Sequence, residues 1–206
     1  MNSAHVWALV GVALVLCTGS GMAEDGVPKS ASPASIREAF FADPTVRLFD
    51  LSVSQESLLA LAASPQSYVP GEIKEGETLL VRIGVRLKGS RGSFRELEQK
   101  PGFAIKFDEY IEGQSYRGFK KLLFNNSVQD SSYVSELLAT GLFRDAGLPA
   151  ARVTHARMRL NGRDLGLYVV VEAMNKDFLK HNFGNAKGNL YAVSYTHLTL
   201  PTIYSV

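Results

Sequence analysis

The fold class is decided by Thr78-Leu79-Leu80-Val81-Arg82-Ile83-Gly84-Val85-Arg86-Leu87-Lys88, a stretch in which apolar and charged residues alternate. Its alternating apolar residues share one face and its basic residues share the other, as in a strand with one buried face. After a Gly/Ser turn, Phe103-Ala104-Ile105-Lys106-Phe107-Asp108 repeats the pattern, with Lys106 opposite the aromatic face. These two strands begin a sheet.

Other elements extend the sheet along the chain. The sequence predicts a strand over 46–53, a helix from Gln55 to Ala63, a helix that follows Asp130-Ser131-Ser132 and ends at Ala146, two strands around the hairpin signal Asn161-Gly162, and a helix from Lys176 to Asn182. The strand over 165–171 is nearly all apolar, so we expect it to be central. The helix before Ala146 carries an apolar stripe of Val134, Leu138 and Leu142. We predict an α+β fold with a mostly antiparallel sheet and a packed helix.

The N-terminal end differs from the middle of the chain because residues 1–23 carry no charged side chain. The apolar run from Val6 to Leu16 is too short to span a bilayer and suits a signal peptide that ends after Ala23. A buried N-terminal helix and a lipid anchor on Cys17, the single cysteine, are the alternatives. We expect a secreted or cell-envelope protein with no membrane span.

All 22 Lys and Arg and all 20 Asp and Glu lie within residues 24–191. Residues 24–35 are polar, contain two prolines and are predicted to be a linker, which leaves 36–191 as the domain. The uncharged segment 192–206 resembles translated adaptor sequence, and we predict that it is a non-native tail; a buried edge strand is the alternative. The net charge of +2, spread along the chain, argues against a nucleic-acid partner.

Several classes of enzyme lack their motifs in this sequence. Beyond the predicted signal peptide there are three histidines, and no His-x-x-x-His pair or matched carboxylates predict a metal site. Ser90 lies in Gly89-Ser90-Arg91-Gly92, which is no nucleophile elbow, and neither a Walker A motif nor a dinucleotide fingerprint is present. Zinc hydrolases, serine hydrolases and P-loop enzymes are therefore disfavoured.

One ordered set of residues points to nucleotide binding. The Gly/Ser turn at Gly89 and Ser90 can cradle phosphates, Lys106 on the next strand can contact one, and Glu136 on the following helix can pair with that lysine. The apolar strand then ends at Glu172, where a base can pair with extended backbone. This is the order of parts in the nucleotide-binding lobe of a protein kinase. Each residue also has an ordinary alternative role. Lys106 can be a solvated strand lysine, Glu136 a helix-surface residue and Glu172 a strand-end charge, and Gly89 and Ser90 can belong to a plain turn.

The chain resembles the spore-coat protein H (CotH) kinase family from about Val85 to Tyr191. The resemblance is carried by Val85-Arg86-Leu87-Lys88-Gly89-Ser90, Phe103-Ala104-Ile105-Lys106-Phe107-Asp108, Gly118-Phe119-Lys120-Lys121-Leu122, Leu142-Phe143-Arg144-Asp145-Ala146-Gly147-Leu148-Pro149, Asn161-Gly162, Gly166-Leu167-Tyr168, Val171-Glu172, Lys176-Asp177-Phe178-Leu179-Lys180, Phe183-Gly184 and Gly188-Asn189-Leu190-Tyr191. So many matches in the same order make the resemblance specific.

The resemblance implies an exported atypical protein kinase that uses ATP and Mg or Mn to phosphorylate Ser or Thr of partner proteins at the cell surface or coat. By position, Lys106 would contact the phosphates and Glu136 would pair with it. Glu172 would lie at the adenine-binding hinge, Gly89 and Ser90 near the phosphates, and Arg86 would help to hold a phosphate or simply form the polar face of its strand.

The family's catalytic and metal-binding acids lie beyond Tyr191, where this sequence has only the uncharged tail. The resemblance therefore implies a kinase-like nucleotide-binding lobe whose C-terminal lobe is missing, with no catalytic or metal residue in this chain and no turnover of ATP. The alternative function is a non-catalytic surface or coat module, for assembly or adhesion, with a kinase-like fold.

Overall fold

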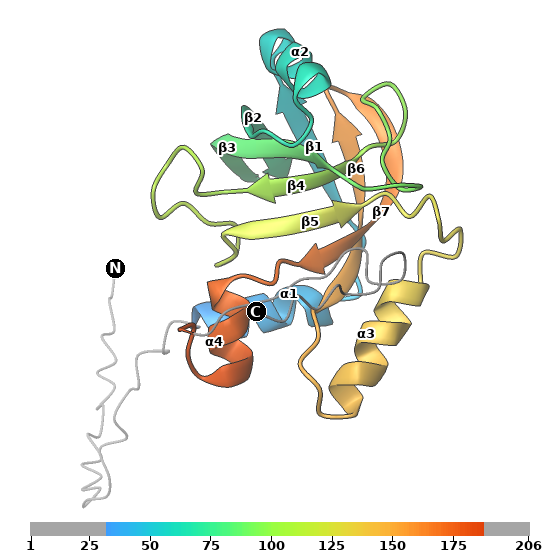
Figure 1. The fold of residues 1–206 in the computed structure, drawn as a ribbon. Coiled ribbons are helices and arrows are strands. Elements are labelled where there is room, and N and C mark those ends of the chain that lie inside the picture. Colours follow the sequence, from blue (N-terminus) through green and yellow to red (C-terminus); the bar gives the residue numbers. More distant parts are fainter. Residues whose placement is uncertain (1–31, 188–206) are drawn as a thin grey trace, which may run out of the picture. The chain divides into compact units, whose positions relative to one another are not determined.

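Seven strands close into a barrel, and four helices lie outside it (Figure 1). The computed structural model describes residues 32–187 of the 206-residue chain. The elements are α1 Pro33–Ala42, β1 Arg47–Val53, α2 Gln55–Ala63, β2 Val69–Glu75, β3 Thr78–Lys88, β4 Gly102–Lys106, β5 Lys121–Asn125, α3 Ser135–Asp145, β6 Val153–Leu160, β7 Arg163–Glu172 and α4 Lys176–Phe183.

The barrel has the strand order β1-β2-β3-β4-β5-β7-β6, and β6 returns to β1 to close it. Six of its seven pairings are antiparallel, and β1 and β6 run parallel, with Arg47 opposite Ala156 and Leu51 opposite Leu160. The mostly antiparallel sheet is thus confirmed, and its closure into a barrel is an addition to the prediction. That the barrel is the nucleotide-binding lobe of a kinase stays a prediction.

The inside of the barrel is filled by alternate side chains from every strand. Ile83, Val85 and Leu87 of β3 are buried there, as the alternation read from the sequence predicts. Leu79 and Val81, expected on the same face, are exposed, and Leu80 packs against the core instead, because the left-handed conformation of Arg82 (φ 52°) shifts the alternation in this half of the strand. Aromatic rings fill the centre, with Phe49 lying 5.3 Å from Phe124 between ring centroids. The basic residues of β3 consequently face outward, because neighbouring side chains on a strand point to opposite faces.

Helix α3 differs from the packed helix that the sequence predicts. It buries none of its residues, and Leu138 and Leu142 of the expected apolar stripe are 61% and 70% exposed. Only Leu137, beside that stripe, packs against a small outer cluster that contains Val153 and Val169. The apolar stripe stays exposed because α3 lies against the outside of the closed barrel and meets it along one edge, through Leu137.

The ends of the described region also bear on the predicted segments. Residues 33–35, the last of the predicted linker, form the first turn of α1, where Ser32 caps the helix and Pro33 occupies its first turn. The predicted signal peptide, the rest of the linker and the predicted tail lie outside the described residues. Within residues 32–187, no helix has the length and apolarity needed to cross a membrane.

Candidate functional site

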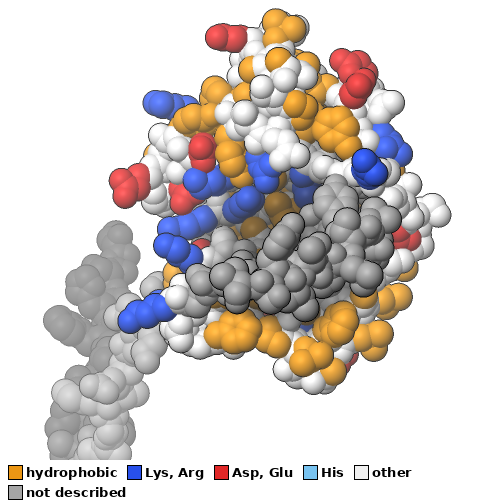
Figure 2. Space-filling view, in the orientation of Figure 1, with side chains coloured by type: hydrophobic (Ala, Val, Ile, Leu, Met, Phe, Trp, Pro, Cys, Tyr) orange, Lys and Arg blue, Asp and Glu red, His pale blue; other side chains and the backbone are white. Residues whose placement is uncertain are grey.

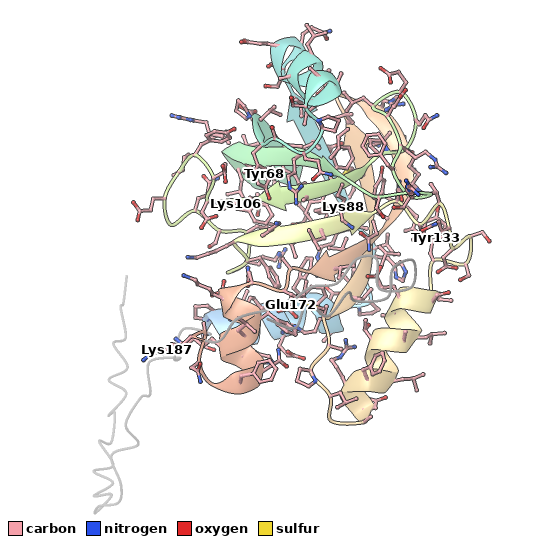
Figure 3. The ribbon with its side chains drawn as sticks, in the orientation of Figure 1. Tyr68, Lys88, Lys106, Tyr133, Glu172 and Lys187 are labelled. Carbon is pink, nitrogen blue, oxygen red and sulfur yellow. The ribbon has the colours of Figure 1, made fainter. Side chains whose placement is uncertain are left out.

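Two lysines lie at opposite ends of neighbouring strands on the outer face of the barrel. Lys88 of β3 is paired with Gly102 of β4, whereas Lys106 of β4 is paired with Gly84 of β3. Four residues of extended strand, about 13 Å, therefore separate the two positions along the sheet. Figure 3 shows Lys106 beside Tyr68, with Lys88 farther along the strands.

Lys88 is the lysine that lies near Glu136. Its Nζ donates to Oδ1 of Asn125 on β5, and Nδ2 of Asn125 donates to Oε2 of Glu136 at 2.6 Å. Burial lowers the pKa of the Lys88 amino group, and the negative charge of Glu136 opposes that shift. Strand β3 and helix α3 are thereby joined through the side chain of Asn125.

These side chains line a pocket of about 290 Å³, called the Lys88 pocket below. Its walls are Lys88, Gly89, Ser93, Gly102, Asn125, Asn126, Ser127, Val128, Gln129, Asp130, Ser135 and Glu136. Gly102 lies close against its neighbours, because a Cβ there would lie 3.0 Å from Cγ of Lys88 and 3.3 Å from the Phe124 carbonyl oxygen, tighter than an ordinary van der Waals contact. The first turn of α3 also borders the pocket through Ser135 and Glu136.

Lys106 has a different partner from the one predicted. Its Nζ lies 2.7 Å from Oε2 of Glu109, and this hydrogen bond raises the pKa of Lys106. Glu109 packs over Gly84, where an added Cβ would come within 2.6 Å of the Glu109 Cβ. The predicted ion pair between Lys106 and Glu136 is therefore wrong, because the strand register puts Lys106 at the far end of the sheet from α3.

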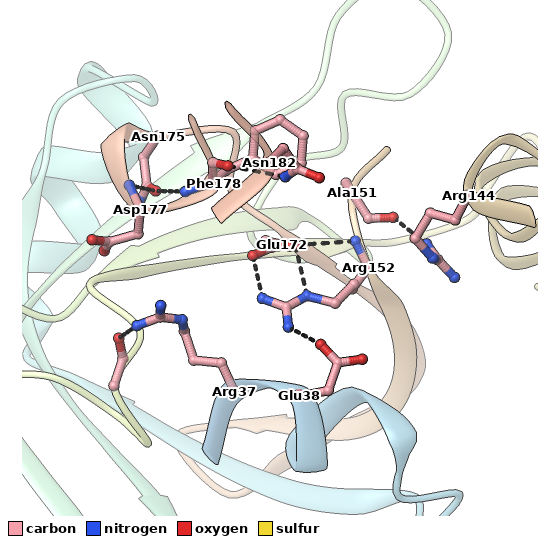
Figure 4. A network of polar contacts seen from close by, with 11 residues as sticks. Arg37, Glu38, Arg144, Ala151, Arg152, Glu172, Asn175, Asp177, Phe178 and Asn182 are labelled. Carbon is pink, nitrogen blue, oxygen red and sulfur yellow. Dashed lines mark hydrogen bonds and ion pairs between the residues drawn. The ribbon is translucent and has the colours of Figure 1, made fainter. Parts of the chain in front are cut away.

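Glu172 is buried in an ion pair with Arg152 (Figure 4). Its Oε1 lies 2.6 Å from Nη2 of Arg152, and its Oε2 accepts from Nε of Arg152 at 2.9 Å. Arg152 also donates to Glu38 of α1 at 2.7 Å, so this network joins α1 to the barrel. The side chain of Glu172 thus has a structural role, and the expectation that Glu172 and the backbone after it lie at an adenine-binding hinge stays a prediction.

The sequence profile of the CotH kinase protein family matches residues 85–202, more than half of the chain. The chain belongs to the CotH kinase protein family. The matched region begins in β3 and contains both lysines, Asn125 and Glu136. It continues into the predicted non-native tail, so that prediction is still open. No match was found among curated proteins.

The remaining predicted residues of this CotH chain are placed as follows. Gly89 and Glu136 line the Lys88 pocket, whereas Ser90 does not; its N–H donates to Oγ of Ser93 at 3.0 Å within the turn. Ser93 faces the pocket in its place. Arg86 is half-buried outside the pocket, with its Cζ 5.4 Å from the centroid of the Tyr68 ring.

Sequence reasoning missed Lys88 and Asn125 in this CotH site. The sequence places Lys88 on the polar face of its strand and at the start of the Gly/Ser turn, but it assigns the phosphate contact to Lys106 instead. Asn125 ends a five-residue strand that was not predicted, so nothing in the sequence placed its amide between Lys88 and Glu136. Both residues depend on the pairing of β4 with β5 and of β3 with β4.

The Lys88 pocket carries two carboxylates and one lysine. Glu136 and Asp130 line it, and Asp130 accepts from the Ser135 N–H at 3.0 Å, at the start of α3. Among residues 32–187, no three His, Cys, Asp or Glu side chains come together to hold a metal ion. Two carboxylates nevertheless fit Mg²⁺ that arrives with a phosphate, since this ion usually takes one or two carboxylates from the protein.

Proposed function

We propose that this chain provides the nucleotide-binding part of an ATP-dependent protein kinase, and that the ATP phosphates bind in the Lys88 pocket. The observation that carries the proposal is the chain of contacts from Lys88 through Asn125 to Glu136, beside the turn at Gly89. It supplies the lysine, the helix glutamate and the glycine turn that phosphate positioning in kinases uses. Membership of the CotH kinase family supports the same reading.

Each part of the pocket has a separate task in this proposal. Lys88 gives a charge-assisted hydrogen bond to a phosphate oxygen, and Asn125 fixes the position of its amino group. Glu136 keeps Lys88 protonated against the effect of burial. The absent Cβ at Gly102 leaves the Lys88 side chain the space it occupies. Lys106, at the other end of the sheet, takes no part in this site.

The charges of the pocket make ATP binding depend on a divalent ion. One lysine faces two carboxylates, Asp130 and Glu136, so a bare triphosphate would be repelled. Bound Mg or Mn supplies the positive charge that neutralises the phosphates. We therefore expect ATP affinity to fall when the divalent ion is chelated.

Phosphate transfer to Ser or Thr of a partner protein, after export of the kinase, is the wider function that we propose. Within the described residues, Asp130 accepts from the N–H groups of Ser132 and Ser135 and is assigned to the metal ion, so we propose no residue that orients a substrate hydroxyl. We therefore expect this chain to bind ATP without transferring its phosphate. Transfer of labelled phosphate from ATP to a protein acceptor by the purified chain would contradict this expectation.

Calorimetric titration with ATP and Mg²⁺ tests the site, using two variants that remove one lysine each. Lys88→Met should weaken binding about tenfold or more, the loss expected when a hydrogen bond from a charged group is removed. Lys106→Met is the matched control and should leave ATP affinity unchanged. The opposite result, with Lys106→Met weakening binding and Lys88→Met leaving it intact, would return the phosphates to the position that the family resemblance implies.

A further inference from the structure

The loop 89–101, which joins β3 to β4, forms one side of the Lys88 pocket. Gly89 and Ser93 of this loop line the pocket. Figure 2 shows that the face on which Figure 3 labels Lys88 is hollowed and carries Lys and Arg side chains in the hollow. Glycine-rich loops of kinases are lids that close over the bound substrate. The contacts of the loop 89–101 decide whether it can move in that way.

Asn126 fastens this loop at two points. Its Nδ2 donates to the carbonyl oxygens of Ser93 and Lys100, both at 2.9 Å. An amide NH2 group has two hydrogens, so these two bonds use its whole capacity as a donor. Asn126 is 5% exposed and directly follows β5, so it is anchored in the wall of the barrel. One side chain thereby ties both the middle and the end of the loop to a strand.

Two side chains from β7 hold the second half of the loop. Arg163 donates to the carbonyl oxygens of Leu97 and Glu98. Oη of Tyr168, which is buried, donates to the Pro101 carbonyl at 2.8 Å. Lifting the loop away from the barrel would break these hydrogen bonds together with those of Asn126, and each one costs free energy to leave unmade.

The loop is also packed against the barrel and folded on itself. Phe94 and Leu97 are partly buried against the main hydrophobic core. Gly89 has a φ of 134°, and a Cβ there would lie 2.7 Å from Cα of Phe94. The N–H groups of Ser93 and Phe94 both donate to the Ser90 carbonyl, at 3.1 and 2.9 Å. Glycine at 89 thus serves a close approach within the loop and not freedom of movement.

We propose that Asn126 is a positioning residue that holds the loop 89–101 as a fixed wall of the Lys88 pocket, which therefore keeps one shape with and without nucleotide. A loop tied to the barrel at its middle and at its end has no free span that could swing over the phosphates. Binding to a site that is already formed carries no cost of ordering the loop, so the full interaction free energy appears as affinity. That the ligand is ATP rests on the proposed function, whereas the fixed loop does not.

Hydrogen–deuterium exchange of the full chain, read by NMR at single residues, tests the proposal with and without ATP and Mg²⁺. The N–H groups of Ser93 and Phe94 should exchange slowly in the free protein, and saturating ATP should change their rates by less than about twofold. In Asn126→Ala the same N–H groups should exchange at least about tenfold faster, because two hydrogen bonds of the loop are lost. ATP should slow them again in this variant, because it binds the ordered loop better.

Asn182→Ala is the matched control, because Nδ2 of Asn182 also donates to a backbone carbonyl, that of Phe178 in α4, at 2.9 Å. This variant should leave the exchange of the loop unchanged. Fast exchange of Ser93 and Phe94 in the unchanged protein that slows when ATP is added would reveal a closing lid and overturn the proposal, whether or not Asn126→Ala folds.

Equal exchange rates in Asn126→Ala and in the unchanged protein would overturn the role of Asn126. The proposed function and the fixed loop can also fail separately. If ATP does not bind, but Ser93 and Phe94 exchange slowly and Asn126→Ala speeds them, the proposed function fails and the fixed loop stands.

Discussion

The buried ion pair between Arg152 and Glu172 should contribute to stability in a strongly coupled way. The two side chains are 8% and 7% exposed, and two hydrogen bonds of 2.6 and 2.9 Å join them side by side. Removing one member of such a pair leaves a buried charge without its partner, which costs about 3–5 kcal/mol of unfolding free energy. Replacing both members by apolar side chains of similar size is often nearly neutral.

Three variants apply this reasoning: Glu172→Met, Arg152→Met and the double substitution. In Glu172→Met, Arg152 keeps its contact with the exposed carboxylate of Glu38, so we expect the unfolding free energy to fall by about 3 kcal/mol. In Arg152→Met, the Glu172 carboxylate keeps only the weak hydrogen bond from the backbone N–H of residue 152 at 3.3 Å, so we expect the unfolding free energy to fall by about 5 kcal/mol. The double variant places methionine against Phe41, over which Arg152 now lies, and should lose less than either single variant.

Urea denaturation gives the free energy of unfolding for the unchanged protein and for the three variants, with equal m-values as the check that the unfolding reaction is the same. Because the two single losses total about 8 kcal/mol and the double variant should lose less than about 3 kcal/mol, the double-mutant cycle should give a coupling energy of about 5 kcal/mol or more. If the two single losses simply add, to within about 0.5 kcal/mol, the pair does not act as a buried unit and the reasoning is refuted.

Two further predictions concern the Lys88 pocket and the closure of the barrel. Burial lowers the pKa of Lys88 below 10.5, and only the charged form of its amino group binds phosphate, so ATP affinity should fall as pH rises towards 10.5. Lys88→Arg should flatten this pH dependence in calorimetric titrations. A pH-independent ATP affinity in the unchanged protein would contradict the prediction. The Asn161 side chain accepts from the N–H of Val53 and donates to its carbonyl, both at 2.8 Å. Asn161→Ala should therefore lower the unfolding free energy, measured in urea, by about 1–2 kcal/mol. An unchanged free energy would contradict a stabilising role for these two hydrogen bonds.

Local patterns in the sequence predicted many of the individual elements. The strand over 78–88 has the predicted bounds, and the helix over 55–63 begins after Ser54, whose side chain accepts from the Ser57 N–H. Helix α4 ends at Gly184 in the left-handed conformation, with φ of 75°. Alternation and caps are local signals, so they survive without knowledge of the rest of the fold.

The barrel and the site depended on contacts that no local pattern encodes. Strand β5 has five residues and β2 contains Pro70 and Gly71, so neither gives a strong strand signal. The register of β3 with β4 decides that Lys88 and not Lys106 lies beside Glu136. Gly89 and Glu136 could be predicted as residues of one pocket, whereas the lysine between them could not, because two lysines on the same outward face look alike in sequence.

The parallel seam between β1 and β6 has a consequence for how the chain is made. Val53 and Asn161, which meet at this seam, are 108 residues apart, and β7 must take its place between β5 and β6 before the ring is complete. As the chain leaves the ribosome, strands β1 to β5 can pair in sequence order, but β1 and β5 then present open edges that can pair with other chains. Ring closure is therefore a late step of high contact order, and until β6 and β7 have paired with them the edges of β1 and β5 stay open to pairing with other chains.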